Sequence, residues 1–482
     1  MSGQNGQENP GQPGSGEALM TVRNYDVLVA GGGNAAVCAA ITAARDGASV
    51  LLVEAAPKFW RGGNTRHTRN CRIAHDSANE VLTGPYPVEE YMEDLLRVTD
   101  GETDMKLAQM TLEQSKDLWD WLNEQGVLFQ QSMGGTLTLS RTNAFFLGGG
   151  KAMLNALYRT AISLGVTVEY DTEVIDVDIV DGFAKTVTVQ KGETTEVVSI
   201  RAFIAASGGF EANIEWLKEA WGPAAENFLI RGTPYNKGRV LRIMMDRGVQ
   251  ILGDPKQCHA VAIDGRAPKF DGGLITRLDC VPFGVVVNAN GERFYDEGED
   301  FWPKRYAIWG RLVAAQPEQV GYVLIDEKSI NNFMPSPFPP DKADTIEELA
   351  EIMGLDGAKV KATVEEFNKA CKGSNFNHNE HDDCHTEGLG INKTHWARPI
   401  DKPPFYGYSL RPGITFTYLG VKVNSDARMI MADGKPSGNM FASGEIMAGN
   451  ILGKGYLAGI GMTIGSVFGR IAGREAAGNA RN

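Results

Sequence analysis

The chain has 482 residues, of which 43% are hydrophobic and 22% are charged, a composition typical of a soluble globular protein with two or more domains. Its formal net charge of -13 argues against binding to nucleic acid or to an anionic membrane surface. The cysteines include no C-x-x-C pair, which argues against an iron–sulfur or structural zinc framework and fits a reducing cytosol. No apolar run reaches about 18 residues, so we expect no membrane span.

Residues 1–19 are rich in Gly, Pro, Gln and Ser and contain no apolar core. A segment of this composition cannot bury enough surface to fold, and it lacks the apolar region of a secretory signal. We therefore predict a disordered N-terminal extension.

Residues 24–54 contain the strongest local pattern. An apolar run to Ala30 predicts a buried strand, a small-residue helix follows, and a second apolar run ends at Glu54. Between the first strand and the helix stand Gly31, Gly33 and Ala36, in the three small-residue places of the β-α-β dinucleotide fingerprint G-x-G-x-x-G/A.

Each residue of this fingerprint has a physical role. Gly31 permits the tight turn, and Gly33 lets the backbone approach a pyrophosphate at the helix N-terminus, where free N–H groups favour an anion. Ala36 lets the helix pack closely on the strand. Glu54 follows about 20 residues after the glycines, where an acid accepts a hydrogen bond from a ribose hydroxyl. The pattern predicts a nucleotide site.

The rest of the chain divides by composition. Periodicity predicts helices over 87–97, 104–125, 148–164, 345–353, 359–371 and 462–477, and strands over 166–170, 173–180, 184–190, 195–200 and 201–206. After about residue 230 short strands and aromatic residues prevail, and 372–388 is a polar stretch. We predict a nucleotide-binding domain over 20–230 that is completed by 389–482, with an inserted domain over 231–388.

A set of motifs in one order resembles a known family. It comprises VLVAGGGNAA (27–36), LLVEAAP (51–57), RGGNTRHTRN (61–70), FIAASGGF (203–210), GVVVNANGERFYDE (284–297), ATVEEFN (362–368), RPIDKPPFYGY (398–408) and NMFASGEI (439–446). These resemble the FAD-dependent fumarate reductase/succinate dehydrogenase flavoproteins, which include ketosteroid dehydrogenases, and within that family most resemble tricarballylate dehydrogenases. The resemblance implies an α/β fold in which a Rossmann-like FAD-binding domain is interrupted by an α+β capping domain.

The resemblance also implies the cofactor and its ligands. Asn64 stands where membrane-bound relatives carry the histidine that bonds covalently to FAD, and His67 comes three residues too late, so we expect non-covalent FAD. The implied cofactor-binding residues are Gly31, Gly33, Asn34, Ala35, Ala36, Glu54, Ala55, Gly62, Gly63, Asn64, Thr65, Val174, Ala206, Ser207, Gly208, Gly444, Glu445, Gly461 and Met462.

Removing hydrogen from a saturated acid needs a hydride acceptor, a base and cations. Soluble fumarate reductases take the proton on an arginine after an R-F-x-N-E segment, and here Arg305 follows the similar residues 293–297. His259 resembles a carboxylate ligand of the family. Tyr456 resembles the substrate-contacting tyrosine of ketosteroid dehydrogenases, and Tyr418 is a further candidate base.

The chain departs from fumarate reductases at several positions. Phe416 replaces a substrate histidine while Thr417 is kept, and Lys454 stands near the position of a lost C-terminal arginine. Arg69 and Arg72 offer bidentate pairing to extra carboxylates, although they also fit FAD phosphate binding or solvent exposure. A substrate with three carboxylates needs such charge.

The resulting expectation is dehydrogenation of tricarballylate to cis-aconitate. Alternatives are a reductase or dehydrogenase acting on another unsaturated acid or a ketosteroid-like substrate, and a non-catalytic flavin-binding subunit. The spacing of His378, His381, Cys384 and His385 matches no metal template, so no metal is expected. We expect a cytoplasmic protein whose electrons pass to a membrane-associated iron–sulfur or haem partner, which can hold it at the inner face of the membrane.

Overall fold

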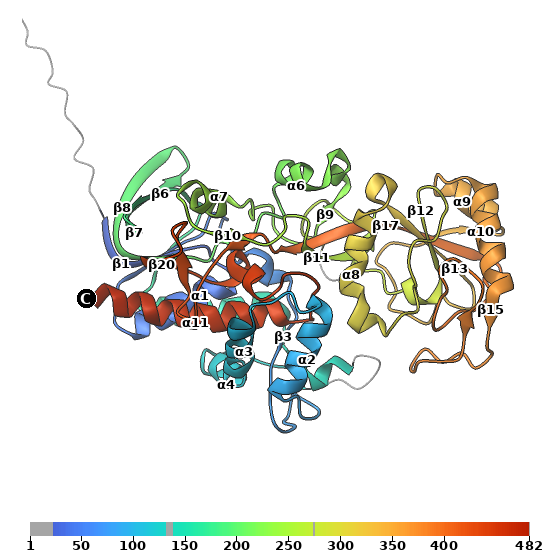
Figure 1. Ribbon diagram of the computed structural model, residues 1–482, viewed down its shortest axis with the longest axis horizontal. Coiled ribbons are helices and arrows are strands. Elements are labelled where there is room, and N and C mark those ends of the chain that lie inside the picture. Colours follow the sequence, from blue (N-terminus) through green and yellow to red (C-terminus); the bar gives the residue numbers. More distant parts are fainter. Residues whose placement is uncertain (1–22, 132–137, 273–274, 482) are drawn as a thin grey trace, which may run out of the picture.

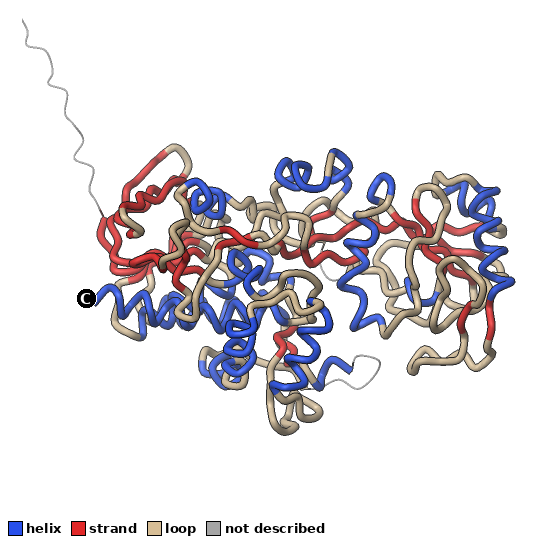
Figure 2. The backbone as a smooth tube through the Cα atoms, in the orientation of Figure 1, coloured by secondary structure: helices blue, strands red, loops and turns tan. Residues whose placement is uncertain are grey.

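The structure, a computed structural model, describes residues 23–131, 138–272 and 275–481 (Figure 1). The predicted disordered extension over 1–19 lies outside these residues. The described chain builds two large sheets, seen at the two sides of the view in Figure 2, and three two-stranded sheets; a long strand connects the regions around the two large sheets.

The first sheet has eight strands. Its main path is β19 (Arg428–Ile430), β20 (Pro436–Ala442), β8 (Thr194–Ala205), β1 (Arg23–Ala30), β2 (Val50–Val53) and β5 (Thr167–Glu169), and β6 (Thr172–Val180) and β7 (Phe183–Lys191) extend from β8. The strands from β20 to β5 are parallel. Residues 27–30 of β1 are fully buried, as expected for a parallel strand covered on both faces. The predicted α/β fold class is confirmed.

Helices α1 (Asn34–Arg45) and α11 (Ile460–Arg481) lie side by side against this sheet (Figure 1). Their close approach depends on small residues, because a Cβ atom at Gly473 would stand 2.3 Å from the Ala39 carbonyl oxygen. Nearby lie α2 (Val88–Thr99), α3 (Met105–Gln114), α4 (Leu118–Glu124), α5 (Gly149–Ser163), β3 (Asn70–Arg72), β4 (Asn143–Phe145), η1 (Gly63–His67) and η2 (Thr138–Arg141).

The single helix predicted over 104–125 is wrong, since α3 and α4 are separate helices. Ser115 stands at the break. Its hydroxyl donates to the Leu112 carbonyl and accepts from the Ala74 N–H. Serine side chains that bond to nearby backbone compete with the helix ladder, which favours a helix end here.

The second sheet has six strands. Its path is β11 (Cys258–Asp264), β17 (Phe405–Thr417), β13 (Gly321–Asp326) and β12 (Val285–Asn288), with β14 (Asp341–Ala343) and β9 (Leu229–Ile230) also paired to β17. Side chains alternate between two cores: Val286 and Val323 pack with α8 (Trp302–Ala314), and Val285 and Leu324 pack with α9 (Ile346–Ile352) and α10 (Gly357–Ala370).

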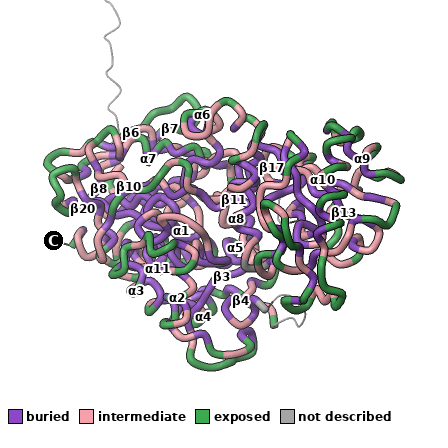
Figure 3. Tube along the Cα trace, turned by 45° about the vertical axis from the view of Figure 1, so that its right-hand side comes forward, coloured by how far each residue is buried: buried purple, intermediate pink, exposed green. Residues whose placement is uncertain are grey.

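Smaller elements complete the chain. They are α6 (Ile214–Trp221), α7 (Arg239–Asp246), β10 (Ile251–Leu252), β15 (Cys371–Lys372), β16 (His385–Thr386), β18 (Gly420–Val421), η3 (Pro223–Asn227), η4 (Val281–Phe283), η5 (Pro317–Gln319) and η6 (Gly444–Asn450). Buried segments form the interior of both parts, with the exposed segments mainly at the periphery (Figure 3).

β17 is the strand that connects the second sheet to the first part of the chain. Its C-terminal residues pair antiparallel with β11, so that Phe416 lies opposite His259 and Thr417 opposite Cys258, with a β-bulge after His259. The domain division at 388/389 stays a prediction. Because β9 and β17 belong to the second sheet, we propose boundaries near residues 228 and 417 instead.

Candidate active site

A pocket lies at the carboxyl ends of β1, β2 and β8, where η1, η6 and the start of α11 also meet. Ligands of open parallel sheets bind at such strand ends. All the predicted cofactor-binding residues except Ala36 line this pocket. Ala36 is fully buried in α1, where its small side chain suits close packing.

The glycine turn after β1 is shaped by contact with the turn after β8. Gly31 has a φ of 118°, and a Cβ atom there would stand 2.3 Å from the Ala206 carbonyl oxygen. Gly33 is the N-cap of α1 and has no side chain to cap the helix, and the Asn34 N–H donates to Thr65 Oγ1 at 3.0 Å. This helix end fits an anionic diphosphate.

Glu54 lies beside the glycine turn that follows β1. Its carboxylate accepts from the N–H groups of Ala56 and Gly62, each at 3.0 Å. Burial raises the pKa of this carboxyl, although the N–H groups act against that shift. An acid here suits recognition of a ribose hydroxyl.

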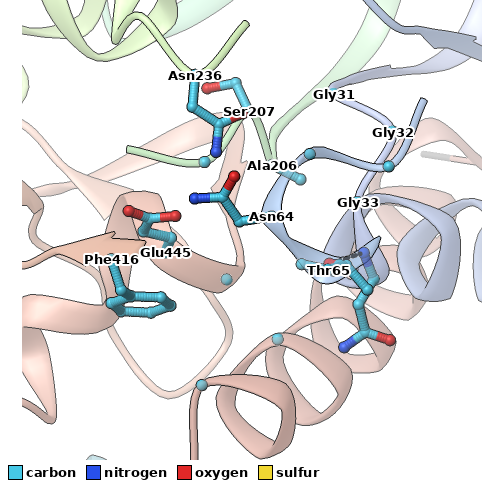
Figure 4. A pocket seen from close by; sticks show the side chains of 18 of the residues that line it. Gly31, Gly32, Gly33, Asn64, Thr65, Ala206, Ser207, Asn236, Phe416 and Glu445 are labelled. Atoms are coloured by element: carbon cyan, nitrogen blue, oxygen red, sulfur yellow. Dashed lines mark hydrogen bonds between the residues drawn. The ribbon is translucent and has the colours of Figure 1, made fainter. Parts of the chain in front are cut away.

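Deeper in the pocket, amide and carboxyl side chains gather around Asn64 (Figure 4). Asn64 Nδ2 donates to the Thr415 carbonyl at 2.7 Å and to Glu211 Oε1, and its Oδ1 accepts from the Thr233 N–H at 3.0 Å. Asn236 Nδ2 also donates to Glu211 Oε1, at 2.7 Å. The position expected for a covalent histidine is therefore occupied by a firmly held amide.

Glu445 lines the same region. Its Oε1 accepts from the Thr417 N–H at 2.7 Å and from the Thr417 hydroxyl at 3.1 Å. Burial raises the pKa of Glu445 to about 7. Sequence reasoning missed Glu211 and Asn236. An acid directly after Gly208-Gly209-Phe210 was the available signal for Glu211, but nothing local in the sequence shows that it faces Glu445.

The pocket continues toward the second sheet, where cations and aromatic rings replace glycines. Its lining here includes Arg69, Arg231, Arg277, His259, Tyr306, Phe416 and Tyr456. The rings of His259 and Tyr456 stack with centroids 3.8 Å apart and planes 4° apart. Arg277 pairs with Asp279, at 2.5 Å from Nε, and its guanidinium lies 4.7 Å from the Tyr306 ring centroid. We call the seven lining residues the cationic end of the pocket.

Arg231 is the least compensated of these cations. Its side chain is buried, its Nη1 donates to Thr415 Oγ1 at 3.4 Å, and its Nε has no hydrogen-bond partner among the described residues. Burial lowers the pKa of Arg231 to about 10, and the charges of Arg277 and Arg69 act in the same direction. Sequence reasoning missed both Arg231 and Arg277, which lie in loops without a distinctive spacing.

The charge of Arg231 also affects the pKa of His259. Burial and then the charge of Arg231 lower the pKa of His259 to about 3, so the imidazole is neutral near pH 7. Its Nδ1 is buried without a hydrogen-bond partner within the described ranges. Burial also lowers the pKa of Arg69, whose guanidinium lies 5.8 Å from the Phe145 ring centroid.

Two of the four predicted catalytic residues, His259 and Tyr456, line the pocket, whereas Arg305 and Tyr418 do not. Arg305 points instead to Glu299 and to the Tyr295 hydroxyl, which it contacts at 3.0 Å. The Tyr418 ring is fully buried, and its hydroxyl donates to the Gly455 carbonyl.

Of the predicted substrate ligands, only Arg69 lines the pocket. Arg72 is buried against Asp94, at 3.4 Å, and donates to the Tyr86 hydroxyl and, from Nε, to the Ala458 carbonyl at 3.1 Å. Lys454 pairs with Asp100 at 2.6 Å and Glu102 at 3.3 Å. Thr417 holds Glu445 and does not itself line the pocket.

Within the described residues, no helix combines the length and apolar character needed to cross a bilayer. The same residues contain no group of three or more His, Cys, Asp or Glu arranged to hold a metal ion.

Residues 26–462 match the FAD binding domain family. An NADH:fumarate oxidoreductase of Klebsiella pneumoniae is 26% identical over 95% of this chain, which spans 48% of that relative's length. A urocanate reductase of Eggerthella lenta is 25% identical over 96% of the chain and 76% of its own.

Solved structures share the fold. An open flavocytochrome c3 fumarate reductase superposes with a TM-score of 0.73 at 23% identity, covering 95% of this chain and 79% of its own. A 3-ketosteroid-Δ4-(5α)-dehydrogenase of Rhodococcus jostii RHA1 also has a TM-score of 0.73 at 23% identity, covering 96% and 99%. With its glycine turn, glycine-capped helix end and buried acid, this chain belongs to the FAD-dependent fumarate reductase/succinate dehydrogenase flavoprotein family, and its cofactor is FAD.

Proposed function

We propose that this FAD-dependent oxidoreductase dehydrogenates a small polycarboxylate at a CH–CH bond, with tricarballylate converted to cis-aconitate. The observation that carries the proposal is the cationic end of the FAD pocket, where Arg69, Arg231 and Arg277 stand together. A buried guanidinium without a counter-ion is costly, so a site that keeps one is suited to an anionic ligand.

The three arginines differ in how far their guanidinium groups are already paired. Arg277 already pairs with Asp279, whereas Arg231 has an unpaired Nε and Arg69 lies against an aromatic ring. A ligand with several carboxylates supplies the missing partners by charge-assisted hydrogen bonds. In a chain of net charge -13, such a site concentrates positive charge where the substrate binds.

FAD bound in the pocket supplies the hydride acceptor for this chemistry. The protein must also take one proton from the neighbouring carbon. We assign this role to Arg231 instead of Arg305, because Arg231 lines the pocket and Arg305 is turned toward Glu299. A pKa of about 10 leaves a small neutral fraction of Arg231 near neutral pH. His259 and Tyr456 then orient the substrate.

Two other functions keep some support. The aromatic lining of Phe416, Tyr306 and Tyr456 also suits a flat ketosteroid-like substrate, and the ketosteroid dehydrogenase named above has the same fold. A non-catalytic flavin-binding subunit has no use for buried, uncompensated arginines beside the cofactor, which argues against that function.

We further propose that FAD is held without a covalent bond, since an amide occupies the position of Asn64. Acid precipitation should then release the yellow colour into the supernatant. The electrons need an acceptor, and a membrane-associated iron–sulfur or haem protein is our proposal, with this chain in the cytoplasm or held at the membrane by that partner. The name of one relative, the fumarate reductase (cytochrome) of Shewanella frigidimarina, includes a haem protein, which supports this proposal.

The test is anaerobic mixing of the oxidised holoenzyme with tricarballylate, succinate and a ketosteroid, followed by flavin absorbance. We expect bleaching by tricarballylate, slower bleaching by succinate and none by the steroid. Bleaching by succinate as fast as by tricarballylate, or by the steroid alone, would reject the assignment. If none of the three bleaches a flavin that dithionite reduces, the substrate lies outside these classes.

A further inference from the structure

The wall of the FAD pocket contains two carboxyl groups placed against each other. Glu211 is fully buried and Glu445 is 9% exposed. Their side chains come from segments more than 200 residues apart, the loop after β8 and η6, and they lie within hydrogen-bonding reach. This arrangement plays no part in the proposed substrate chemistry.

The hydrogen bonds around the pair leave one oxygen unexplained. Glu211 Oε1 accepts from the amides of Asn64 and Asn236, and Glu445 Oε1 accepts twice from Thr417. Glu211 Oε2 is buried with no donor in reach among the described residues. The Glu445 carboxyl is the side chain within hydrogen-bonding reach of the Glu211 carboxyl. Two ionised carboxylates cannot satisfy each other, whereas a proton between them supplies the missing donor.

Among the described residues, neither nearby guanidinium bonds to either carboxyl of the pair. Arg231 donates to Thr415, and Arg311 donates to the side chain of Gln257. The other titratable groups that face the pair are the Cys258 thiol and the Tyr418 phenol, and burial raises the pKa of both, which keeps them neutral. No neighbouring group in the described chain therefore neutralises a second negative charge.

We propose that Glu211 is a positioning residue that carries a shared proton and donates it to Glu445, so that the pair holds one negative charge, and not two, in the wall of the FAD pocket. The protonated Glu211 keeps Oε1 free to accept from Asn64 and Asn236, which fixes both amides against the cofactor. This inference depends on FAD binding but not on the identity of the substrate.

The buried geometry also fixes the direction of the pH effect. Burial, followed by the charge of Glu445, raises the pKa of Glu211 well above its ordinary value, and Glu445 is raised to about 7. The folded protein therefore holds protons that the unfolded chain has released above about pH 4.3. Stability contributed by the pair falls as pH rises from there through the folded-state titration.

The experiment replaces Glu211 by glutamine, whose amide mimics the protonated acid. We expect the melting temperature of the Glu211→Gln holoenzyme to match that of the wild type at about pH 5 and to exceed it increasingly toward about pH 8, because only the wild type holds a proton in the folded state that the unfolded chain releases. FAD affinity, measured by flavin fluorescence, should likewise weaken with pH in the wild type more than in this variant.

The matched control is Glu297→Gln. Glu297 is another fully buried glutamate, but it pairs with Arg293 at 2.6 Å. Its neutral variant should melt below the wild type across the whole pH range, since it leaves a buried guanidinium unpaired. If Glu211→Gln behaves like this control, the shared proton does not exist.

Infrared spectroscopy of the wild type decides the matter if the variant does not fold. A buried carboxylic acid C=O stretch should be present at neutral pH and lost at high pH, with one protonated carboxyl per chain assigned to the pair. Absence of any protonated carboxyl at neutral pH would overturn the proposal.

Discussion

The two ends of the pocket are built in different ways. The end at β1, β2 and β8 is made of backbone and small side chains, with Gly31, Gly33 and Ser207 from the turns that follow two neighbouring strands of one sheet. The cationic end is made of long side chains from loops, β11, β17 and α8, brought together by tertiary packing and strand pairing. A shared cofactor can be recognised by backbone shape, while substrate choice requires side chains that vary independently of the fold.

This difference predicts the outcome of substitutions, and the largest effect belongs to the backbone end. Gly31→Val should abolish FAD binding, because its Cβ would stand 2.3 Å from the Ala206 carbonyl oxygen and the two turns would separate. The purified variant should lack flavin absorbance. Gly47→Val is the control, since Gly47 also has a positive φ, of 86°, but open space around it. A yellow Gly31→Val protein would contradict the close approach of the two turns.

At the cationic end, Arg231→Met should retain FAD and lose substrate-driven flavin reduction by at least about a hundredfold, as expected for loss of a positioned base. Wild-type reduction should accelerate up to about tenfold per pH unit between about pH 7 and 9, because the neutral fraction of a group with a pKa of about 10 grows in that range. Stopped-flow absorbance measures both.

Two controls test the other candidate bases, His259 and Arg305. A rate that is flat over the same range would instead point to His259, whose pKa of about 3 leaves it neutral throughout. Arg305→Met should reduce flavin at nearly the wild-type rate. If it is inactive while Arg231→Met is active, the sequence-based assignment of Arg305 is restored.

A smaller effect, confined to stability, is expected for Arg72. Arg72→Met removes a buried guanidinium from Asp94, the Tyr86 hydroxyl and the Ala458 carbonyl, and should cost about 1.5–3 kcal/mol of unfolding free energy. Its KM for the acid should stay unchanged, whereas Arg69→Met should raise KM by about tenfold or more. Chemical denaturation and steady-state kinetics test the two halves. Equal changes in KM would place Arg72 in the substrate site after all.

The smallest effect belongs to Lys454, which pairs with exposed acids and not with the pocket. Lys454→Met should leave KM, kcat and FAD content as in the wild type. A rise in KM specific to tricarballylate would show that Lys454 moves into the site when substrate binds.

The backbone end was predictable because its residues follow one another. Gly31, Gly33 and Glu54 lie within a single β-α-β unit, where spacing along the chain becomes spacing in the fold. Motif resemblance extended this to Ser207 and Glu445, and the structure places both in the pocket lining. The α/β class followed from the same periodicity.

The cationic end was not predictable from spacing. Arg231 and Arg277 become neighbours through the pairing of β9 and β11 with β17, a register that local sequence does not encode. Arg305 lies outside the pocket lining because its side chain leaves α8 on the side of Glu299, whereas the next residue, Tyr306, lines the pocket. The motif before α8 does not specify which side of the helix each residue occupies. Glu211 was overlooked because its importance depends on a partner more than 200 residues away.

β17 has a consequence for engineering this protein. Its thirteen residues pair with β11, β13, β14 and β9, and its last residues, Phe416 and Thr417, stand beside the pocket lining and Glu445. In a chimera that exchanges only residues 231–388 for those of another enzyme, β17 of this protein would have to pair on both edges with strands from the other enzyme. A long strand left without matched partners is prone to intermolecular pairing, so such a graft should aggregate. Exchange of 229–417 as one block keeps the strand with its own sheet and places one junction beside the cofactor pocket.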